Sequence, residues 1–174
     1  YGVEGKISYV VMRLLRGGTL AQRLSQQADA EHPLPSLGET VKVLNQLSGA
    51  LDYAHSKGVI HRDIKPSNVM FDQHGNAYLV DFGIAKLLAA TKSITTTGLV
   101  MGTPLFMAPE QWRAEDVVPA TDQYSFGVMA YLLVTGKFPF DADTPHGLMY
   151  KHLSEKPAPP QMHRLDVPQE VTAV

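Results

Sequence analysis

A carboxylate, a lysine and an amide side chain occur close together at residues 61–68, which read HRDIKPSN. A second carboxylate, Asp81, follows this segment. The apolar runs 69–71 and 77–80 lie between them and flank a polar, glycine-containing stretch, a pattern typical of a β-hairpin. Because antiparallel strands return the chain to its starting edge, the pattern predicts that Asn68 and Asp81 lie at the same end of a hairpin.

The remaining periodic segments predict helices. Ser36 and Glu39 have the spacing of a capping box. The apolar stripe that follows them predicts a helix of about 20 residues that ends at Gly58. Residues 121–136 are apolar on most sides, which predicts a buried helix. Two shorter helices and one strand are expected at residues 19–29, 144–154 and 7–12, respectively.

Composition limits the classes of function. With 174 residues, 44% of them hydrophobic and 18% charged, the chain is long enough to form one sizeable core. A net charge of -2 predicts no general attraction to nucleic acid or to anionic membranes. The absence of cysteine excludes disulfides and thiolate metal sites. The sequence contains no run of about 18 apolar residues, the length needed to span a membrane.

Three motifs, taken in order, resemble those of protein kinases. Residues 61–68 are similar to the catalytic loop H-R-D-x-x-x-x-N, and residues 81–83 are the D-F-G motif. Residues 102–111, GTPLFMAPEQ, resemble the kinase segment that ends in Ala-Pro-Glu, which small-molecule phosphotransferases lack. Taken alone, the first two motifs are ordinary turns, and the third is the most discriminating. Their order, together with residues 150–160, indicates a resemblance to bacterial (Hanks-type) Ser/Thr protein kinases.

The resemblance implies a fold that is mainly α with a small β-hairpin, namely the large (C-terminal) lobe of a kinase with one or two strands of the small lobe. The expected boundaries are 1–12 for the end of the small lobe, 13–18 for the hinge, 19–160 for the large lobe, 61–68 for the catalytic loop, 81–110 for the activation segment, and 161–174 for a tail truncated before the final helices.

The resemblance also implies the chemistry of the site. Phosphoryl transfer requires positioning and neutralisation of phosphate charge. Asp63 is expected to accept the proton of the substrate hydroxyl, Lys65 to stabilise the transferred group, and Thr103 to bridge the two. Asn68 and Asp81 are the expected oxygen ligands of Mg²⁺ or Mn²⁺. The residues expected to contact ATP are Met12, Leu15, Thr19, Lys65, Ser67, Asn68, Met70 and Asp81.

Further residues receive regulatory or structural roles from the resemblance. Arg62 precedes the predicted base and is expected to bind a phosphate carried by Thr95 or Thr97. Asp122 is expected to hold the backbone of the catalytic loop from the N-terminal end of its helix. The residues with expected structural roles are His61, Phe82, Glu110 and Asp122.

Some expected parts of a kinase are not found in the sequence. No glycine-rich loop or strand lysine precedes residues 13–18, and no arginine after Glu110 is recognisable as its ion-pair partner. A buried carboxylate that lacks its partner costs about 3 to 5 kcal/mol of stability. We therefore expect the 174-residue chain on its own to be marginally stable and catalytically inactive.

The leading hypothesis is a Ser/Thr protein kinase that transfers the γ-phosphoryl group of ATP to protein hydroxyls. Two alternatives stay open: a pseudokinase that acts as a binding or scaffolding module, and a small-molecule phosphotransferase. The expected partners are ATP and protein substrates but not nucleic acid, and the domain is expected to be cytoplasmic. A membrane anchor on the whole protein and homodimerisation for autophosphorylation are left open.

Overall fold

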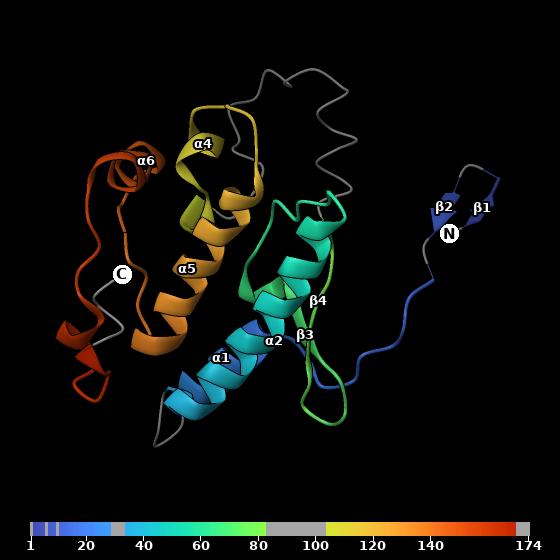
Figure 1. The fold of residues 1–174 in the computed structure, drawn as a ribbon, viewed down its shortest axis with the longest axis horizontal. Coiled ribbons are helices and arrows are strands. Elements are labelled where there is room, and N and C mark those ends of the chain that lie inside the picture. The colour runs from blue at the N-terminus through green and yellow to red at the C-terminus, as the bar shows by residue number, and fades with distance from the viewer. Residues whose placement is uncertain (1, 6, 10, 29–33, 83–103, 170–174) are drawn as a thin grey trace.

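The computed structural model describes residues 2–5, 7–9, 11–28, 34–82 and 104–169. Figure 1 shows a group of helices with a small hairpin beside them and a second hairpin at the N-terminal end. The helices are α1 (Leu20–Ala28), α2 (Leu37–Ser56), α4 (Pro109–Trp112), α5 (Pro119–Thr135) and α6 (Pro145–Ser154). The strands are β1 (Gly2–Glu4), β2 (Ile7–Tyr9), β3 (Val69–Phe71) and β4 (Ala77–Leu79). Short 3-10 turns cover Pro66–Asn68, Pro104–Phe106 and Pro160–Met162. The prediction of a mainly α fold with a small hairpin is confirmed.

The core lies where α2 and α5 pack together with the β3–β4 hairpin. Leu47 and Leu51 of α2 belong to the same buried apolar cluster as Met129 and Leu133 of α5 and Phe71 of β3. Complete burial of side chains of this size stabilises a fold by about 1.5 to 3 kcal/mol each. The two helices therefore form the rigid support on which the intervening segment is held.

The ends of α2 and α5 follow from local sequence. The capping box of α2 is confirmed, because the Ser36 hydroxyl accepts the Glu39 N–H at 3.2 Å and the Glu39 carboxylate accepts the Ser36 N–H at 3.0 Å. α5 ends at Gly136, which has a left-handed φ of 72°. α5 starts at Pro119, slightly earlier than predicted, since proline suits the first turn of a helix.

The predicted β3–β4 hairpin is confirmed. The two strands are antiparallel, with Val69 opposite Leu79. The Asp72 carboxylate closes the connecting loop by accepting the backbone N–H groups of His74 at 2.8 Å and Asn76 at 2.9 Å. Hydrogen bonds from the side chain and backbone of Asn76 hold the pKa of Asp72 well below its usual range. The loop is thus fixed, and the two open ends of the hairpin lie together.

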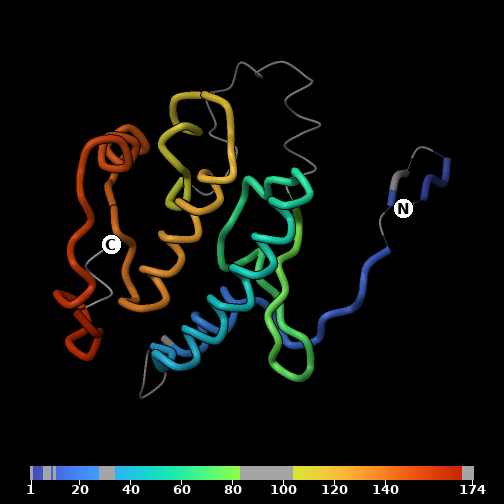
Figure 2. Tube along the Cα trace, viewed as in Figure 1, coloured from blue at the N-terminus to red at the C-terminus, as the bar shows by residue number. Residues whose placement is uncertain are grey.

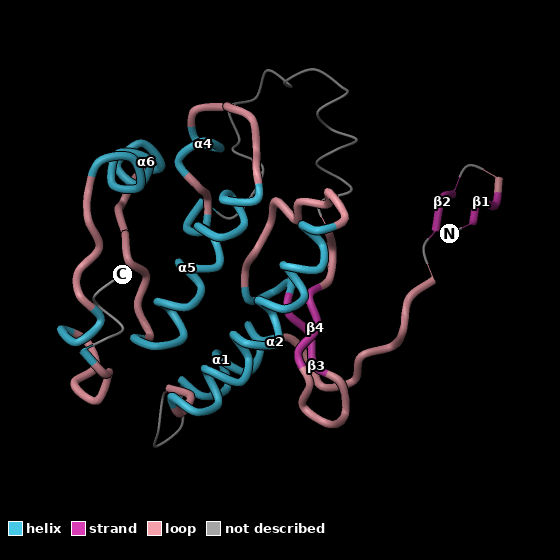
Figure 3. The backbone as a smooth tube through the Cα atoms, in the orientation of Figure 1, coloured by secondary structure: helices cyan, strands magenta, loops and turns pink. Residues whose placement is uncertain are grey.

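The N-terminal strand is shorter than predicted. β2 ends at Tyr9, which pairs with Gly2, and the pairing with β1 extends over three residue pairs. Residues 11 and 12 have no partner strand among the described residues, so they continue as an extended segment. Figure 3 shows this segment as a loop that leads from the β1–β2 hairpin towards the helices.

Residues after the α6 helix return to α5, as the chain trace in Figure 2 shows. The Tyr131 hydroxyl donates to the Ala158 carbonyl at 2.9 Å. The Arg164 guanidinium donates to the carbonyls of Val134 at 3.3 Å and Pro35 at 3.0 Å. Arg164 therefore satisfies a carbonyl near the C-terminal end of α5, where a cation is favourable.

Residues 17–19 run alongside β3. Gly17 N–H donates to the Phe71 carbonyl at 2.8 Å, and Phe71 N–H donates to the Gly18 carbonyl at 2.9 Å. A Cβ atom placed on Gly17 would lie 2.5 Å from the Asp72 carbonyl oxygen and 2.8 Å from that of Phe71. The close approach of two backbones therefore requires glycine at position 17.

Substitution of Gly17 tests this contact. We expect Gly17→Ala to lower the free energy of unfolding by about 1 to 3 kcal/mol, because the added methyl group overlaps main-chain atoms that cannot move aside. Gly49→Ala is the matched control: this glycine lies inside α2 with no atom near its Cβ position, and we expect roughly 0.5 to 1 kcal/mol of stabilisation. Urea unfolding monitored by circular dichroism measures both, and equal effects of the two changes would contradict the contact.

His152 of α6 is the centre of an aromatic cluster. Its side chain is only 5% exposed, and its Nδ1 lies 2.8 Å from the Tyr124 hydroxyl. Phe140 lies 5.0 Å from the imidazole and Trp112 lies 6.2 Å from it, measured between ring centroids. Burial lowers the pKa of His152 from 6.5 to about 4. The imidazole is therefore neutral in the folded protein at neutral pH.

This burial predicts a pH-dependent stability. The unfolded chain binds a proton at His152 below pH 6.5, whereas the folded chain binds it only near pH 4. The free energy of unfolding is therefore expected to fall as the pH is lowered through this interval. Urea unfolding at several pH values should show a weaker decline for His152→Gln, with His146→Gln on the exposed side of α6 as the control. An unchanged decline in His152→Gln would contradict the assignment.

Candidate active site

The carboxylate of Asp122, in the first turn of α5, holds the start of segment 61–68. Asp122 is 1% exposed. Its Oδ2 accepts the backbone N–H of His61 and its Oδ1 accepts that of Arg62, each at 2.7 Å. The Nε2 of His55 at the end of α2 lies 2.8 Å from Oδ2. One buried carboxylate thus joins α2, α5 and two consecutive amides of the loop.

Arg62 adopts a conformation that is unfavourable for any residue with a side chain. Its φ is 68°, in the left-handed region, which costs of order 1 to 2 kcal/mol for L-residues. Two hydrogen bonds hold its backbone there: the N–H donates to Asp122, and the carbonyl accepts the Gln111 side chain at 3.2 Å. The turn orients the next residue, Asp63.

His61 is completely buried beneath the loop. Its Nε2 lies 2.9 Å from the Val80 carbonyl, and its Nδ1 accepts the Asp63 N–H at 3.3 Å. The Phe82 ring packs against the imidazole at 4.7 Å. Burial lowers the pKa of His61, against the opposing effects of the Val80 carbonyl and of nearby carboxylates. A neutral imidazole with its hydrogen on Nε2 satisfies both contacts, so His61 joins the loop to the end of the β3–β4 hairpin.

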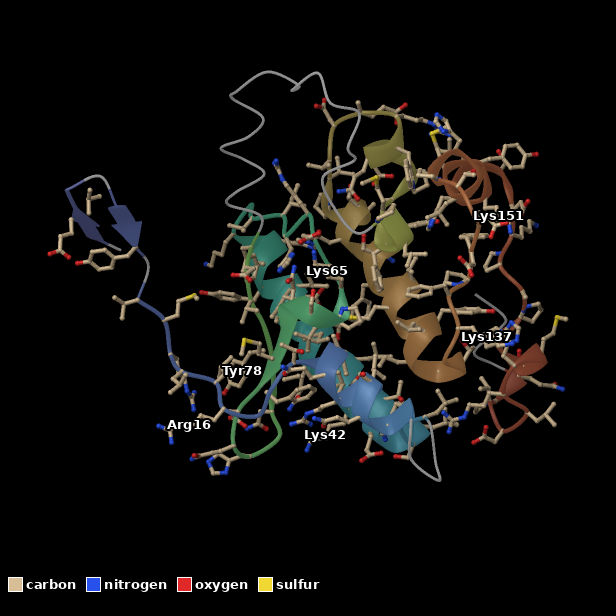
Figure 4. The ribbon with its side chains drawn as sticks, turned by 180° about the vertical axis from the view of Figure 1, so that it is seen from behind. Arg16, Lys42, Lys65, Tyr78, Lys137 and Lys151 are labelled. Atoms are coloured by element: carbon tan, nitrogen blue, oxygen red, sulfur yellow. The ribbon has the colours of Figure 1, made fainter. Side chains whose placement is uncertain are left out.

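The side chains of Asp63, Lys65 and Asn68 lie together. The Asp63 Oδ2 is 2.8 Å from the Lys65 ammonium and accepts the Asn68 amide N–H at 3.0 Å. The same Asn68 amide also donates to the Asp63 carbonyl at 2.8 Å. Figure 4 shows Lys65 where this segment lies between α2 and α5. The carboxylate of Asp63 is thus oriented by a cation and an amide.

Oxygen atoms of Asn68 and Asp81 remain available for a cation. The Asn68 amide nitrogen donates both side-chain hydrogen bonds of this residue, and its Oδ1 accepts none from the described residues. The hairpin brings Asp81 close, since Val80 N–H donates to the Asn68 carbonyl at 2.9 Å. Asp81 is exposed, with a left-handed φ of 58°. An amide oxygen and a carboxylate are the hard ligands that Mg²⁺ takes together with phosphate and water. The described ranges contain no ready-made cluster of three His, Cys, Asp or Glu ligands.

The residues predicted to contact ATP fall into two groups. Thr19 and Met70 lie side by side through an isolated β-bridge, and Ser67 is exposed on the turn next to Asn68. Met12 is 66% exposed on the extended segment, and Leu15 on the same segment is half-buried. The Arg13 guanidinium donates to the Tyr78 hydroxyl at 3.2 Å, and this hydrogen bond links the extended segment to β4. Thr95, Thr97 and Thr103 lie outside the described residues.

Glu110 differs from the expectation of a buried carboxylate without a partner. Its side chain is half-buried and accepts a hydrogen bond from the Thr121 hydroxyl of α5. This hydroxyl donor was not predicted, and it is within reach because α4 packs on the start of α5. Among the described residues no arginine forms an ion pair with Glu110, so the expected marginal stability stays a prediction.

A groove of about 460 Å³ lies between α1, α2 and the β3–β4 hairpin. Residues of these elements line it, including Leu20, Arg23, Val43 and Phe71. None of the residues predicted for catalysis or nucleotide binding lines the groove. We therefore assign it no part in the chemistry of segment 61–68.

Comparison with known proteins identifies the family. The model of the protein kinase domain matches residues 3–172. The chain belongs to the protein kinase family. Curated relatives include a probable serine/threonine-protein kinase of Clostridium acetobutylicum, 36% identical over 96% of the chain and 24% of the relative. PknB of Mycolicibacterium smegmatis is 36% identical over 98% of the chain and 27% of its own length. PknA of Mycobacterium tuberculosis is 40% identical over 90% of the chain and 35% of its own length.

These relatives are named as serine/threonine-protein kinases, and the chain spans about a quarter to a third of their lengths. The predicted resemblance to bacterial Ser/Thr kinases is confirmed at the level of the family. Among the residues that the structure describes, no helix is both long and apolar enough to cross a membrane.

Several contacts around segment 61–68 and α4 were not predicted. Gln111 donates to the Arg62 carbonyl, His55 pairs with Asp122, and the Thr121 hydroxyl donates to Glu110. His55 and Thr121 belong to apolar helical stretches, and Gln111 follows the Ala-Pro-Glu motif. Their side-chain types carry no signal of these contacts, which join residues far apart in sequence.

Removal of the Asp122 charge tests its role as the anchor of the loop. An Asn side chain retains one acceptor oxygen for the two amides of residues 61 and 62, so one buried N–H loses its partner. We expect Asp122→Asn to lower the free energy of unfolding by about 1.5 to 3 kcal/mol. Urea unfolding measures the loss, and Asp116→Asn, at an exposed position, is the control. Stability equal to that of the control would contradict the anchor.

Proposed function

We propose that the protein containing this chain is a serine/threonine protein kinase that transfers the γ-phosphoryl group of ATP to hydroxyls of protein substrates. The observation that carries the proposal is the orientation of the Asp63 carboxylate by Lys65 and Asn68, at 2.8 and 3.0 Å. The names of the relatives support the choice of Ser and Thr as acceptors.

The geometry supports a division of roles. Asp63 accepts the proton of the attacking hydroxyl, since its carboxylate is held rigidly by neighbouring donors. Lys65, which lies 2.8 Å from that carboxylate, carries the positive charge that offsets the charge of the transferred phosphoryl group. Bound Mg²⁺ or Mn²⁺ supplies further neutralisation of the phosphates. Asn68 Oδ1 and the Asp81 carboxylate are the oxygens that hold this cation.

The nucleotide is proposed to lie above the β3–β4 hairpin. Met70 and Thr19, joined by a β-bridge, would contact the adenine and the ribose, and Ser67 lies next to Asn68. Residues 13–18 serve as the hinge, and Met12 and Leu15 then contact the adenine from the extended segment. The proposal places the domain in the cytoplasm, where ATP is available, and treats homodimerisation and a membrane anchor as open to measurement.

A regulatory role is proposed for Arg62, the residue with a left-handed φ that precedes Asp63. The Arg62 backbone is fixed by contacts with α5 and α4, so a phosphate on Thr95 or Thr97 that pairs with its guanidinium would tie those threonines to the loop. Thr103 is proposed to bridge Asp63 and Lys65 when the substrate is bound.

Substitution of the base tests the proposal. We expect Asp63→Asn in the full-length protein to lower the rate of phosphoryl transfer by about 10²- to 10⁴-fold, because the general base is lost. The dissociation constant for ATP should change little, since Asn68 and Asp81 remain. Transfer of labelled γ-phosphate to a Ser- and Thr-rich protein measures the rate, and fluorescence titration with a nucleotide analogue measures binding.

Asp143→Asn is the matched control at an exposed position before α6. Undiminished transfer by Asp63→Asn would remove Asp63 from the mechanism. ATP binding by the unsubstituted protein without transfer to any acceptor would favour a pseudokinase. Transfer to small alcohols in preference to proteins would favour a small-molecule phosphotransferase.

A further inference from the structure

The side chain of Gln111 bridges two segments that are distant in sequence. Its Oε1 accepts the Ala108 N–H at 3.0 Å, and its Nε2 donates to the Arg62 carbonyl at 3.2 Å. Gln111 directly follows the Ala-Pro-Glu motif and lies in α4, and its side chain is half-buried. The amide therefore connects the segment after residue 103 to the catalytic loop.

The Arg62 carbonyl belongs to the peptide unit that leads into Asp63. The other side of that unit, the Asp63 N–H, is bound by the His61 Nδ1 at 3.3 Å. The preceding peptide unit is bound through the Arg62 N–H by Asp122 at 2.7 Å. Within this left-handed turn, Gln111 supplies the hydrogen bond to the carbonyl side. Loss of that bond leaves the peptide plane that sets the direction of the Asp63 side chain held only by the 3.3 Å contact of the Asp63 N–H with His61.

α4 is itself firmly attached to the body of the domain. The Glu110 carboxylate accepts the Thr121 hydroxyl of α5, and the Ser125 hydroxyl of α5 donates to the Phe106 carbonyl at 2.7 Å. A displacement of α4 would therefore be transmitted through Gln111 to the Arg62 carbonyl. This physical connection differs from that of Asp122, which reaches the loop from α5 through the N–H groups of His61 and Arg62.

We propose that Gln111 is a positioning residue for phosphoryl transfer, which couples the placement of the Ala-Pro-Glu segment to the orientation of Asp63. The inference rests on the proposed kinase function. Gln111 touches neither nucleotide nor acceptor in this assignment. It acts through the main chain of Arg62, and its effect is on the rate of transfer from the bound state, not on nucleotide binding.

Two substitutions separate the two hydrogen bonds of the amide. Gln111→Glu keeps an oxygen that can accept the Ala108 N–H, but it loses the donor to the Arg62 carbonyl and places negative charge against it. Gln111→Lys keeps a donor for the Arg62 carbonyl and loses the acceptor for Ala108. If Gln111 only caps α4, the lysine variant should lose more kcat than the glutamate variant. If Gln111 positions the loop, the glutamate variant should lose more.

We expect kcat of the full-length protein to fall by about tenfold or more in Gln111→Glu and by clearly less in Gln111→Lys. KM for ATP should stay within about twofold of the unsubstituted value in both, since the nucleotide contacts are unaltered. Gln26→Glu and Gln26→Lys, at an exposed position of α1, are matched controls for the introduced charges. A larger kcat loss in Gln111→Lys than in Gln111→Glu, or equal losses in the two, would overturn the proposal.

A second measurement is independent of catalysis. Hydrogen exchange of a peptide that covers residues 59–66 should be faster in Gln111→Glu than in Gln111→Lys, because the turn around Arg62 opens more often. Unchanged exchange in Gln111→Glu would overturn the proposal. If the unsubstituted protein transfers no phosphate, the proposed function fails, while the exchange measurement still decides whether Gln111 holds the turn.

Discussion

A single buried carboxylate determines the geometry of this domain. Asp122 accepts the N–H groups of two consecutive residues, His61 and Arg62, and pairs with His55. A charge with so little exposure is tolerated only when donors surround it. Those donors come from α2 and from the loop. The same carboxylate of α5 therefore joins the α2–α5 contact to the backbone of the loop. A change that displaces α5 from α2 is therefore expected to move the loop as well.

The contacts that shape the loop end on its main chain. Asp122 binds two backbone N–H groups, Gln111 binds the Arg62 carbonyl, and His61 binds the Asp63 N–H. The backbone of a turn with an unfavourable φ is thereby over-determined by its surroundings. The hydrogen bonds of Asp122 and Gln111 to this main chain therefore do not engage the Asp63 carboxylate. The Asp63 carboxylate is in turn oriented by side chains of the same segment, the Lys65 ammonium and the Asn68 amide.

The sequence predicts structure well where the interacting residues are close together in the chain. The capping box of Ser36 and Glu39, the hairpin between Asn68 and Asp81, and the end of α5 at Gly136 all follow from spacing and turn residues. The hydrogen bonds of Gln111 and His55 and the Thr121 contact of Glu110 do not. Each depends on which helices pack together, and a polar residue on a helix has many compatible partners in the absence of that packing. The three sequence motifs predict the kinase family, but they do not predict the contacts made by Gln111, His55 and Thr121.

The left-handed turn at Arg62 has a consequence for the order in which the domain forms. Its anchor, Asp122, lies 60 residues further along the chain. Synthesis proceeds at about 5 to 20 residues per second, and contacts of large sequence separation form late. For the first seconds after residues 61–68 leave the ribosome, the turn has no carboxylate to hold it. A nascent chain therefore emerges without an assembled site, and the site closes only after α5 has been made.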